Sequence, residues 1–172
     1  IGNPDPVAPA VIRGIWENGH NTNAAIEISG NIFNNASGAN TANLNRQTAL
    51  WVTSRSGSVK KVEYKNNEIS RFKEGLAWLG GLYTGNTAPD YETGAFPVEV
   101  KNNKFDATLN AVTVRKSVTS TNAGSPGYME NNSFTNFVPG GLAIKNEGTG
   151  HAQSVCNWYG TTSLPAVAAL NG

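Results

Sequence analysis

The chain has 172 residues, a formal net charge of +1 and 15% charged residues. This length suits a single domain with a buried core, and the near-neutral charge provides no basic surface for nucleic acid. No apolar run approaches the roughly 20 residues that a membrane helix needs, and the single Cys156 excludes an internal disulfide framework. The 23 asparagines and 19 glycines are typical of a β-rich chain with many turns.

A short strand followed by an asparagine corner recurs along the chain. It reads IEISGNIF, VEYKNNEI, VEVKNNKF and GYMENNSF, with a weaker copy, AQSVCNWY, near the end. The second asparagine recurs at intervals of 36, 36, 29 and 25 residues, at Asn31, Asn67, Asn103, Asn132 and Asn157. Self-similarity at such a period indicates a solenoid or another repeat array.

A second strand follows each copy except the last. These strands read TALWV, GLAWL, NAVTV and GLAIK, and an earlier GIWEN at 14–18 has the same form with no first strand before it. We therefore interpret the chain as a segment of a longer protein. The strands are short and rich in Val, Ile and Phe at alternate positions, and no segment has an apolar stripe of helical period.

Parallel strands stacked repeat on repeat fit this pattern. Each strand then pairs with its copies above and below, with Val98 and Val100 inside and Glu99 and Lys101 outside. At the corner, an asparagine adopts the left-handed backbone conformation at low cost. Its side-chain amide can also bond the asparagine of the next repeat, so we predict that the five repeated asparagines form a structural ladder.

The corner N-x-[FI], present in four copies, and the ending CNWYG at 156–160 carry a family resemblance. The chain resembles right-handed parallel β-helix proteins of the pectate-lyase-like superfold, whose secreted bacterial members commonly close with NNWWG. The resemblance implies an all-β solenoid of about three to four complete coils with one long loop insertion at 80–97. It also implies a β-helix over 1–162 that continues from an upstream part, a linker or truncated tail at 163–172, and an extracellular or cell-surface location.

Three glutamates occupy equivalent outward positions, Glu27, Glu63 and Glu99, with Lys65 and Lys101 two residues further on. Stacked carboxylates raise one another's pKa and are candidates for an acid/base pair or a cation site. Alternatively, each glutamate pairs with a lysine of its own or the next repeat. We expect the ion pairs, because the lysines are placed to neutralise the column.

Enzymes of this superfold gather carboxylates around calcium beside a basic residue, or cluster aspartates across the scissile bond. This chain has three aspartates, Asp5, Asp90 and Asp106, which do not recur in register. We therefore predict no catalytic residue, no metal site and no cofactor. We expect structural or incidental roles for the other reactive side chains, with Cys156 a buried small residue. These side chains are Arg71, Arg115, Lys116, His20, His151 and Cys156.

The aromatic residues are the candidate ligand site. If the second strands alternate regularly, Trp51 and Trp78 face outward in one column and form a flat platform of the kind on which sugars stack. The insertion that follows carries Tyr83 and Tyr91, which either join this platform or cover the indoles as a small satellite core. We expect Trp158 and Tyr159 to plug the end of the stack.

The sequence thus predicts a non-enzymatic stalk or adhesin-like region of a larger secreted or surface protein. Its expected partners are cell-surface glycans and, through the ends of the coil stack, other copies of itself. Neither nucleic acid nor a membrane span is expected. The alternative is a fragment of a polysaccharide lyase or glycoside hydrolase whose catalytic coils lie partly outside this chain.

Overall fold

The computed structural model describes residues 12–19, 25–36, 47–54, 61–79, 98–115, 127–147 and 152–160. Fourteen β-strands lie within these ranges, and none of the residues described there is helical. The strands form three sheets, called A, B and C below. Every pairing between neighbouring strands of these sheets is parallel.

The chain visits the three sheets in turn. Sheet A contains, in spatial order, β1 (Ile12–Gly19), β4 (Gln47–Ser54), β7 (Glu74–Leu79), β10 (Asn110–Arg115) and β13 (Leu142–Asn146). Sheet B contains β2 (Ala25–Ser29), β5 (Lys61–Lys65), β8 (Val98–Lys101), β11 (Gly127–Glu130) and β14 (Ala152–Val155). Sheet C contains β3 (Ile32–Asn34), β6 (Glu68–Ser70), β9 (Lys104–Asp106) and β12 (Ser133–Thr135).

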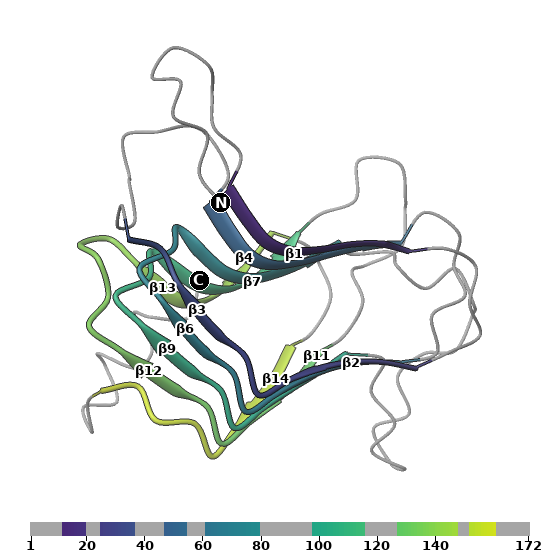
Figure 1. The fold of residues 1–172 in the computed structure, drawn as a ribbon. Helices are drawn as coiled ribbons and strands as arrows, with labels where there is room; N and C mark the ends of the chain where they lie inside the picture. The colour runs from purple at the N-terminus through teal and green to yellow at the C-terminus, as the bar shows by residue number, and fades with distance from the viewer. Residues whose placement is uncertain are drawn as a thin grey trace.

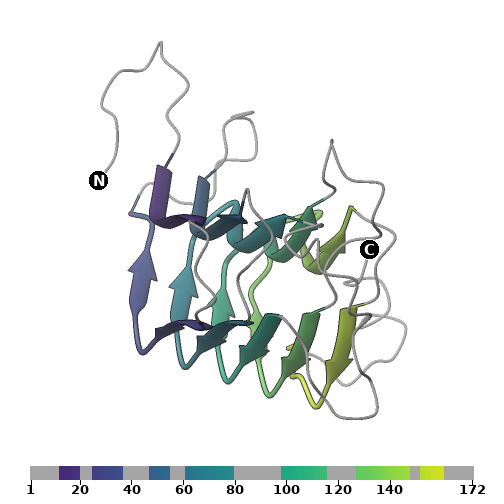
Figure 2. The same cartoon turned by 90° about the vertical axis from the view of Figure 1, so that its right-hand side faces the viewer.

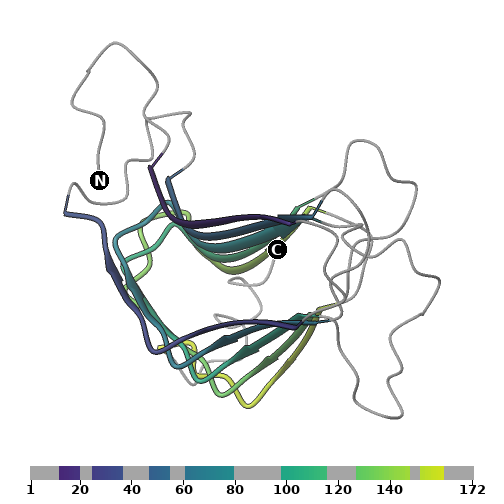
Figure 3. The same ribbon diagram turned by 45° about the vertical axis from the view of Figure 1, so that its right-hand side comes forward.

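The three sheets face a common interior, with sheet C joining one end of sheet B to the region of sheet A (Figures 1 and 3). Seen from the side, each sheet is a row of strands stacked from the first repeat to the last (Figure 2). The all-β architecture of repeating parallel strands is therefore confirmed, and it is compatible with a β-solenoid.

Apolar side chains of equivalent positions stack in columns inside the sheets. In sheet B, Val62 lies beside Val98, and both are fully buried. In sheet C, the rings of Phe105 and Phe134 stack with their centroids 5.2 Å apart. Gly75 of β7 lies so close to this column that a Cβ atom there would come within 2.7 Å of Cδ1 of Phe105. This close approach of backbone to ring requires glycine.

At the corner between sheets B and C, one residue turns the chain and the residue after it forms the hydrogen bonds of the ladder. The first corner residue of each repeat has a left-handed backbone, with φ between 52° and 68°. These residues are Gly30, Asn66, Asn102, Asn131 and Cys156. Glycine and asparagine tolerate this conformation best, which explains the composition of the column. The expectation that one asparagine both turns the chain and forms the ladder is therefore wrong, because the left-handed residue and the ladder residue are separate, consecutive positions.

The second corner residue forms the ladder. From Asn31 to Asn132, each ladder asparagine donates its backbone N–H and its side-chain Nδ2 to Oδ1 of the next, at 2.8 to 3.1 Å, and Asn157 is the last acceptor. Nδ2 also donates to a strand carbonyl of the preceding repeat, as from Asn103 to Tyr64 O at 2.9 Å. Asn67, Asn103 and Asn132 are buried, so the ladder satisfies polar groups that have lost contact with water.

The last repeat differs from the expected closure in two side chains. Cys156, predicted to be buried, is exposed, because the left-handed corner column lies at the surface. Trp158, predicted to plug the stack with Tyr159, is 49% exposed. Tyr159 does pack on the interior, with its ring 5.3 Å from that of Phe134. The aromatic column of sheet C therefore ends in Tyr159, while Trp158 stays on the outer face.

Candidate functional site

The charged outer face of sheet B gathers the glutamates and lysines that the sequence singled out. Strand register places Glu27 beside Glu63 and Glu63 beside Glu99. Lys65 lies beside Lys101 in a second column, two residues further along the strands. These five residues, called the charged column below, come from β2, β5 and β8, so parallel stacking alone brings them together.

Ion pairs link the two rows of the charged column. Lys65 Nζ lies 3.0 Å from Glu63 Oε1 in its own strand and 3.8 Å from Glu27 Oε2 in the preceding repeat. Lys101 Nζ lies 3.0 Å from Glu99 Oε2. The predicted pairing of glutamates with lysines of the same or the next repeat is therefore present.

Burial increases along the charged column. The side chain of Glu27 is 52% exposed, that of Glu63 is 16% exposed, and that of Glu99 is 8% exposed. The lysine side chains keep contact with solvent, at 29% exposure each. A carboxylate that has lost most of its water depends on its remaining partners, so we expect removal of one partner to cost most in the pair of Glu99 and Lys101.

Tyr128 continues the glutamate row in β11, beside Glu99. Lys101 Nζ lies 5.1 Å from the centroid of its ring, within the range of a cation–π contact. Burial, and then the nearby carboxylate of Glu130, raise the pKa of the Tyr128 hydroxyl, while Lys101 opposes them. The phenol therefore stays protonated at neutral pH and offers a hydrogen-bond donor rather than a general base.

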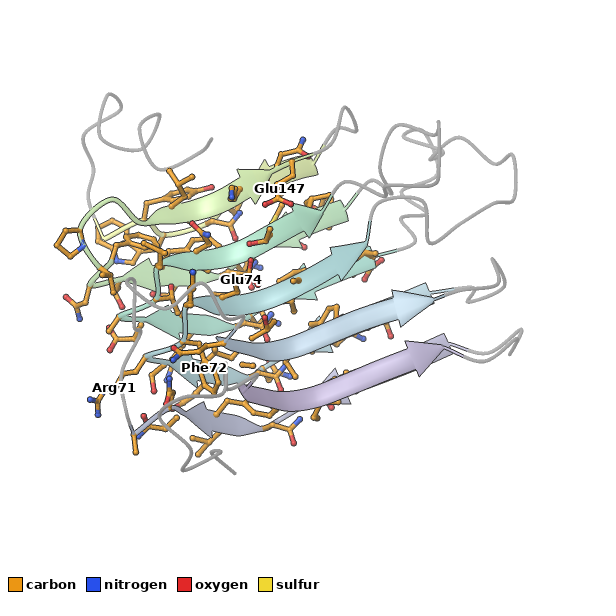
Figure 4. The ribbon with its side chains drawn as sticks, turned by 90° about the horizontal axis from the view of Figure 1, so that it is seen from above. Arg71, Phe72, Glu74 and Glu147 are labelled. Atoms are coloured by element: carbon orange, nitrogen blue, oxygen red, sulfur yellow. The ribbon has the colours of Figure 1, made fainter. Side chains whose placement is uncertain are left out.

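Asp106, the aspartate within the described ranges, has a structural role. Its Oδ1 accepts hydrogen bonds from Thr135 Oγ1 at 2.9 Å and from Asn136 Nδ2 at 2.7 Å. Its carbonyl oxygen accepts the backbone N–H of Arg71, which has a left-handed conformation. Arg71 is exposed and points away from the sheets (Figure 4), as expected of a surface cation.

Sequence reasoning missed a buried carboxylate in sheet A. Glu74, at the start of β7, is 5% exposed and accepts a hydrogen bond from Thr48 Oγ1 at 2.9 Å (Figure 4). Thr48, Glu74 and Asn110 are neighbours in register. The sequence signal that could have revealed this row is a polar residue at or next to the start of β4, β7 and β10. Their side chains make a buried polar row rather than a cleft.

The tryptophan platform is not supported by the strand register. Trp51 of β4 pairs with Ala77 of β7, whereas Trp78 pairs with Val52. The two tryptophans therefore lie in adjacent columns, and the prediction that they share one column is wrong. Ala49, which the predicted alternation places outside, is fully buried, as are its strand neighbours Thr48 and Leu50.

Several candidate residues fall outside what the structure describes. For Trp51, Trp78 and Arg115 it describes the backbone but not the side chain. The remaining candidates lie outside the described ranges altogether, as do the insertion at 80–97 and the tail from 161 onward. These are Tyr83, Tyr91, Asp5, Asp90, Lys116, His20 and His151.

Two wider properties of the described residues bear on the type of site. They contain no cluster of three or more His, Cys, Asp or Glu side chains arranged to hold a metal ion. No helix among them is long and apolar enough to cross a membrane. Comparisons of the chain with protein-family models, with curated proteins and with solved structures find no match.

Proposed function

We propose that this chain is a non-enzymatic structural region, a rigid stalk or adhesin-like segment of a larger protein. In this proposal it is a right-handed parallel β-helix of the pectate-lyase-like superfold. The recurrent N-x-[FI] corner and the closing CNWYG support that assignment. So do three parallel sheets visited in turn by the chain.

The observation that carries the proposal is the continuity of the stacking. The same asparagine contact repeats at every step from Asn31 to Asn157. On the outer face of sheet B, the carboxylates that would serve as acids, bases or cation ligands are engaged with lysines. Stacked asparagines hold successive repeats together, and glutamates paired with lysines are not available as an acid and base pair. Both features favour a structural role.

A location outside the cell or on its surface, and contact with glycans there, belong to the same proposal. The location rests on the resemblance of the closing motif to that of secreted proteins. Glycan contact rests on the aromatic residues at the start of the insertion and within it, Trp78, Tyr83 and Tyr91, whose rings are suited to stacking on sugars.

An activity assay tests the non-enzymatic role against a lyase or hydrolase fragment. The purified chain is incubated with polygalacturonate and related uronans, with and without calcium. We expect neither unsaturated product nor new reducing ends. Turnover that disappears in Glu63→Gln, while the fold is retained by circular dichroism, would overturn the proposal and make the charged column an active site.

A glycan array tests the ligand. We expect Trp78→Ala to weaken any polysaccharide binding that the parent chain shows, with Trp158→Ala as the matched control, because Trp158 is an exposed tryptophan that pairs with sheet C in the last repeat. Equal binding by the parent and the Trp78 variant would remove the glycan site and leave the stalk role standing.

A further inference from the structure

Two asparagines of the chain stand in the acceptor motif for N-linked glycans. The motif is Asn-x-Ser or Asn-x-Thr, in which x is any residue except proline. Of the 23 asparagines, only Asn35 and Asn131 have it, in NAS at 35–37 and in NNS at 131–133. The motif alone does not distinguish the two asparagines, because each is followed by a serine at the second position.

The fold is closed to a glycan at Asn35. This residue is 7% exposed, and its Nδ2 donates to Gln47 Oε1 at 3.2 Å in a contact that is itself buried. A saccharide bonded to Nδ2 would need space that a close-packed interior does not leave. A chain that carried a glycan at Asn35 could therefore not form this contact between the end of sheet C and the start of β4.

The fold is open to a glycan at Asn131. This residue is exposed at the corner between sheets B and C, where it has the left-handed conformation with a φ of 55°. Among the described residues, none forms a hydrogen bond with its side-chain amide. A saccharide can therefore be attached to Nδ2 of Asn131 without the loss of a hydrogen bond.

The serine of the motif has no hydrogen-bonding role in the fold. Ser133 begins β12 and is half-buried, and its hydroxyl has no hydrogen-bond partner within the described ranges. Stacking does not require a serine there, because the equivalent positions of the other repeats hold four different side chains. These are Ile32, Glu68, Lys104 and Trp158. The hydroxyl at Ser133 is thus available for the recognition that the acceptor motif describes.

The position of the corner suits a bulky polar group. The left-handed corner residues are exposed in every described repeat, so they form a continuous outer edge. Figures 1 and 3 show this edge on the side of the stack opposite sheet A. A glycan on the edge is separated from sheet A by the width of the stack. It therefore adds a solubilising group without covering sheet A.

We propose that Asn131 is the acceptor of an N-linked glycan and that Asn35 is not. In the transfer step, Nδ2 of Asn131 forms a bond to C1 of an oligosaccharide that is carried on a lipid diphosphate. The bond from C1 to the diphosphate oxygen breaks, the lipid diphosphate leaves, and the amide gives up one proton to the transferase. The secreting cell supplies donor and transferase, so the inference rests on the extracellular location in the proposed function.

Transfer precedes completion of the fold. A transferase has to bind all three residues of the motif, but in the folded chain Asn132 is 1% exposed. Its backbone N–H and Nδ2 donate to Asn157 Oδ1 at 2.8 and 2.9 Å. The motif at 131–133 is therefore glycosylated before the last repeat stacks on it. The fold then selects among the products, because a chain modified at Asn131 can complete the stack and a chain modified at Asn35 cannot.

Expression of the full chain behind a secretory leader, in a eukaryotic host that glycosylates this motif, tests the site. We expect the secreted chain to carry one glycan. An amidase that releases N-linked glycans leaves aspartate at the acceptor, so peptide mass spectrometry should find aspartate at position 131 and asparagine at position 35. The leader supplies the location, so a missing glycan would count against the site alone. The uronan assay tests the structural role separately.

Variants of the motif separate recognition from folding. Asn131→Gly and Ser133→Ala should each abolish the glycan, and Ser133→Thr should retain it. Asn131→Gly preserves the backbone of the corner, because Gly30 occupies the same column with a φ of 68°. Asn35→Gln should leave the glycan in place.

The preceding repeat offers a matched gain of a site. Asn102 is exposed with a φ of 57°, and Lys104 stands where the motif requires a hydroxyl. Lys104→Thr should therefore add a second glycan, at Asn102. Its ion pair with Glu68 is solvent-exposed, so the loss of that pair has little effect on the fold. A secreted parent without a glycan, a glycan that persists in Ser133→Ala, a secreted chain modified at Asn35, or a Lys104→Thr chain with no second glycan would each overturn the inference.

Discussion

Asn103 donates two hydrogen bonds to one oxygen of Asn132: its backbone N–H and its Nδ2 each lie 3.0 Å from Asn132 Oδ1. Both residues are 1% exposed, so water does not reach either group. The contact joins a corner of one repeat to the corner of the next. It therefore connects local turn geometry to the stacking of successive repeats.

Replacing Asn103 tests the energetic role of the ladder. Asn103→Leu removes the Oδ1 acceptor used by Asn67 and the Nδ2 donor to Asn132 and Tyr64, and it leaves these partners buried. We expect the free energy of unfolding in urea to fall by about 1 to 3 kcal/mol. Asn102→Gly is the control, since it changes the adjacent exposed corner residue and should alter stability by less than ~0.5 kcal/mol. An unchanged unfolding curve for Asn103→Leu would show that the ladder contributes nothing.

The left-handed corners predict opposite effects of two glycine exchanges. Gly30 has a φ of 68°, and a Cβ atom there would meet nothing within 4 Å, so Gly30→Ala should cost about 1 kcal/mol from backbone strain alone. Arg71 has a φ of 64° and is exposed, so Arg71→Gly should stabilise the fold by ~0.5 to 1 kcal/mol. Thermal unfolding measures both changes. A shift in the same direction for both variants contradicts the prediction.

The charged column predicts a stability difference between its two ends. Glu99→Gln removes the partner of Lys101 at a site where the glutamate side chain is 8% exposed, and should cost about 2 kcal/mol. Glu27→Gln acts at a 52% exposed site where Lys65 Nζ is 3.8 Å away, and should cost less than ~0.5 kcal/mol. Urea unfolding at low and high salt compares them. Equal losses of unfolding free energy in the two variants would show that burial does not determine the contribution of these ion pairs.

Tyr128 predicts a pH dependence at alkaline pH. Burial and the Glu130 carboxylate raise the pKa of its hydroxyl in the folded chain, so the folded state binds more protons than the unfolded one above the ordinary tyrosine value of about 10. The resulting contribution to stability is complete below that pH and is lost as pH rises through the folded pKa. Ultraviolet difference titration of the parent against Tyr128→Phe isolates this hydroxyl. Titration at or below the ordinary value contradicts the prediction.

The repeating architecture could be predicted from the sequence because a solenoid makes the same local demands at every turn. Short alternating strands and an asparagine corner recur at intervals of 25 to 36 residues, and the stacked corners bond the asparagines that recur. The sequence did not show which of the two corner residues turns the chain and which forms the ladder. In the pairs Asn66 with Asn67 and Asn102 with Asn103 the two residue types are identical, although one turns the chain and the other forms the ladder.

Only the tertiary structure decided the strand register of sheet A and whether corner residues such as Cys156 are buried or exposed. Leu50 pairs with Leu76 rather than with Ala77, and a shift of one residue moves a side chain to the opposite face. The sequence did not reveal this shift, because the strands are apolar on both faces. Cys156 was expected inside from its residue type, yet the exposed corner column determines its position.

The sequence by itself therefore determined what repeats: the strands, the corner and the partners of each asparagine. Only the tertiary structure decided what happens where repetition stops. Ile32 and Trp158 are far apart in the chain, and nothing in their local sequence relates them. Stacking places them in one column of sheet C, at the first and last of its described positions, and both are exposed there.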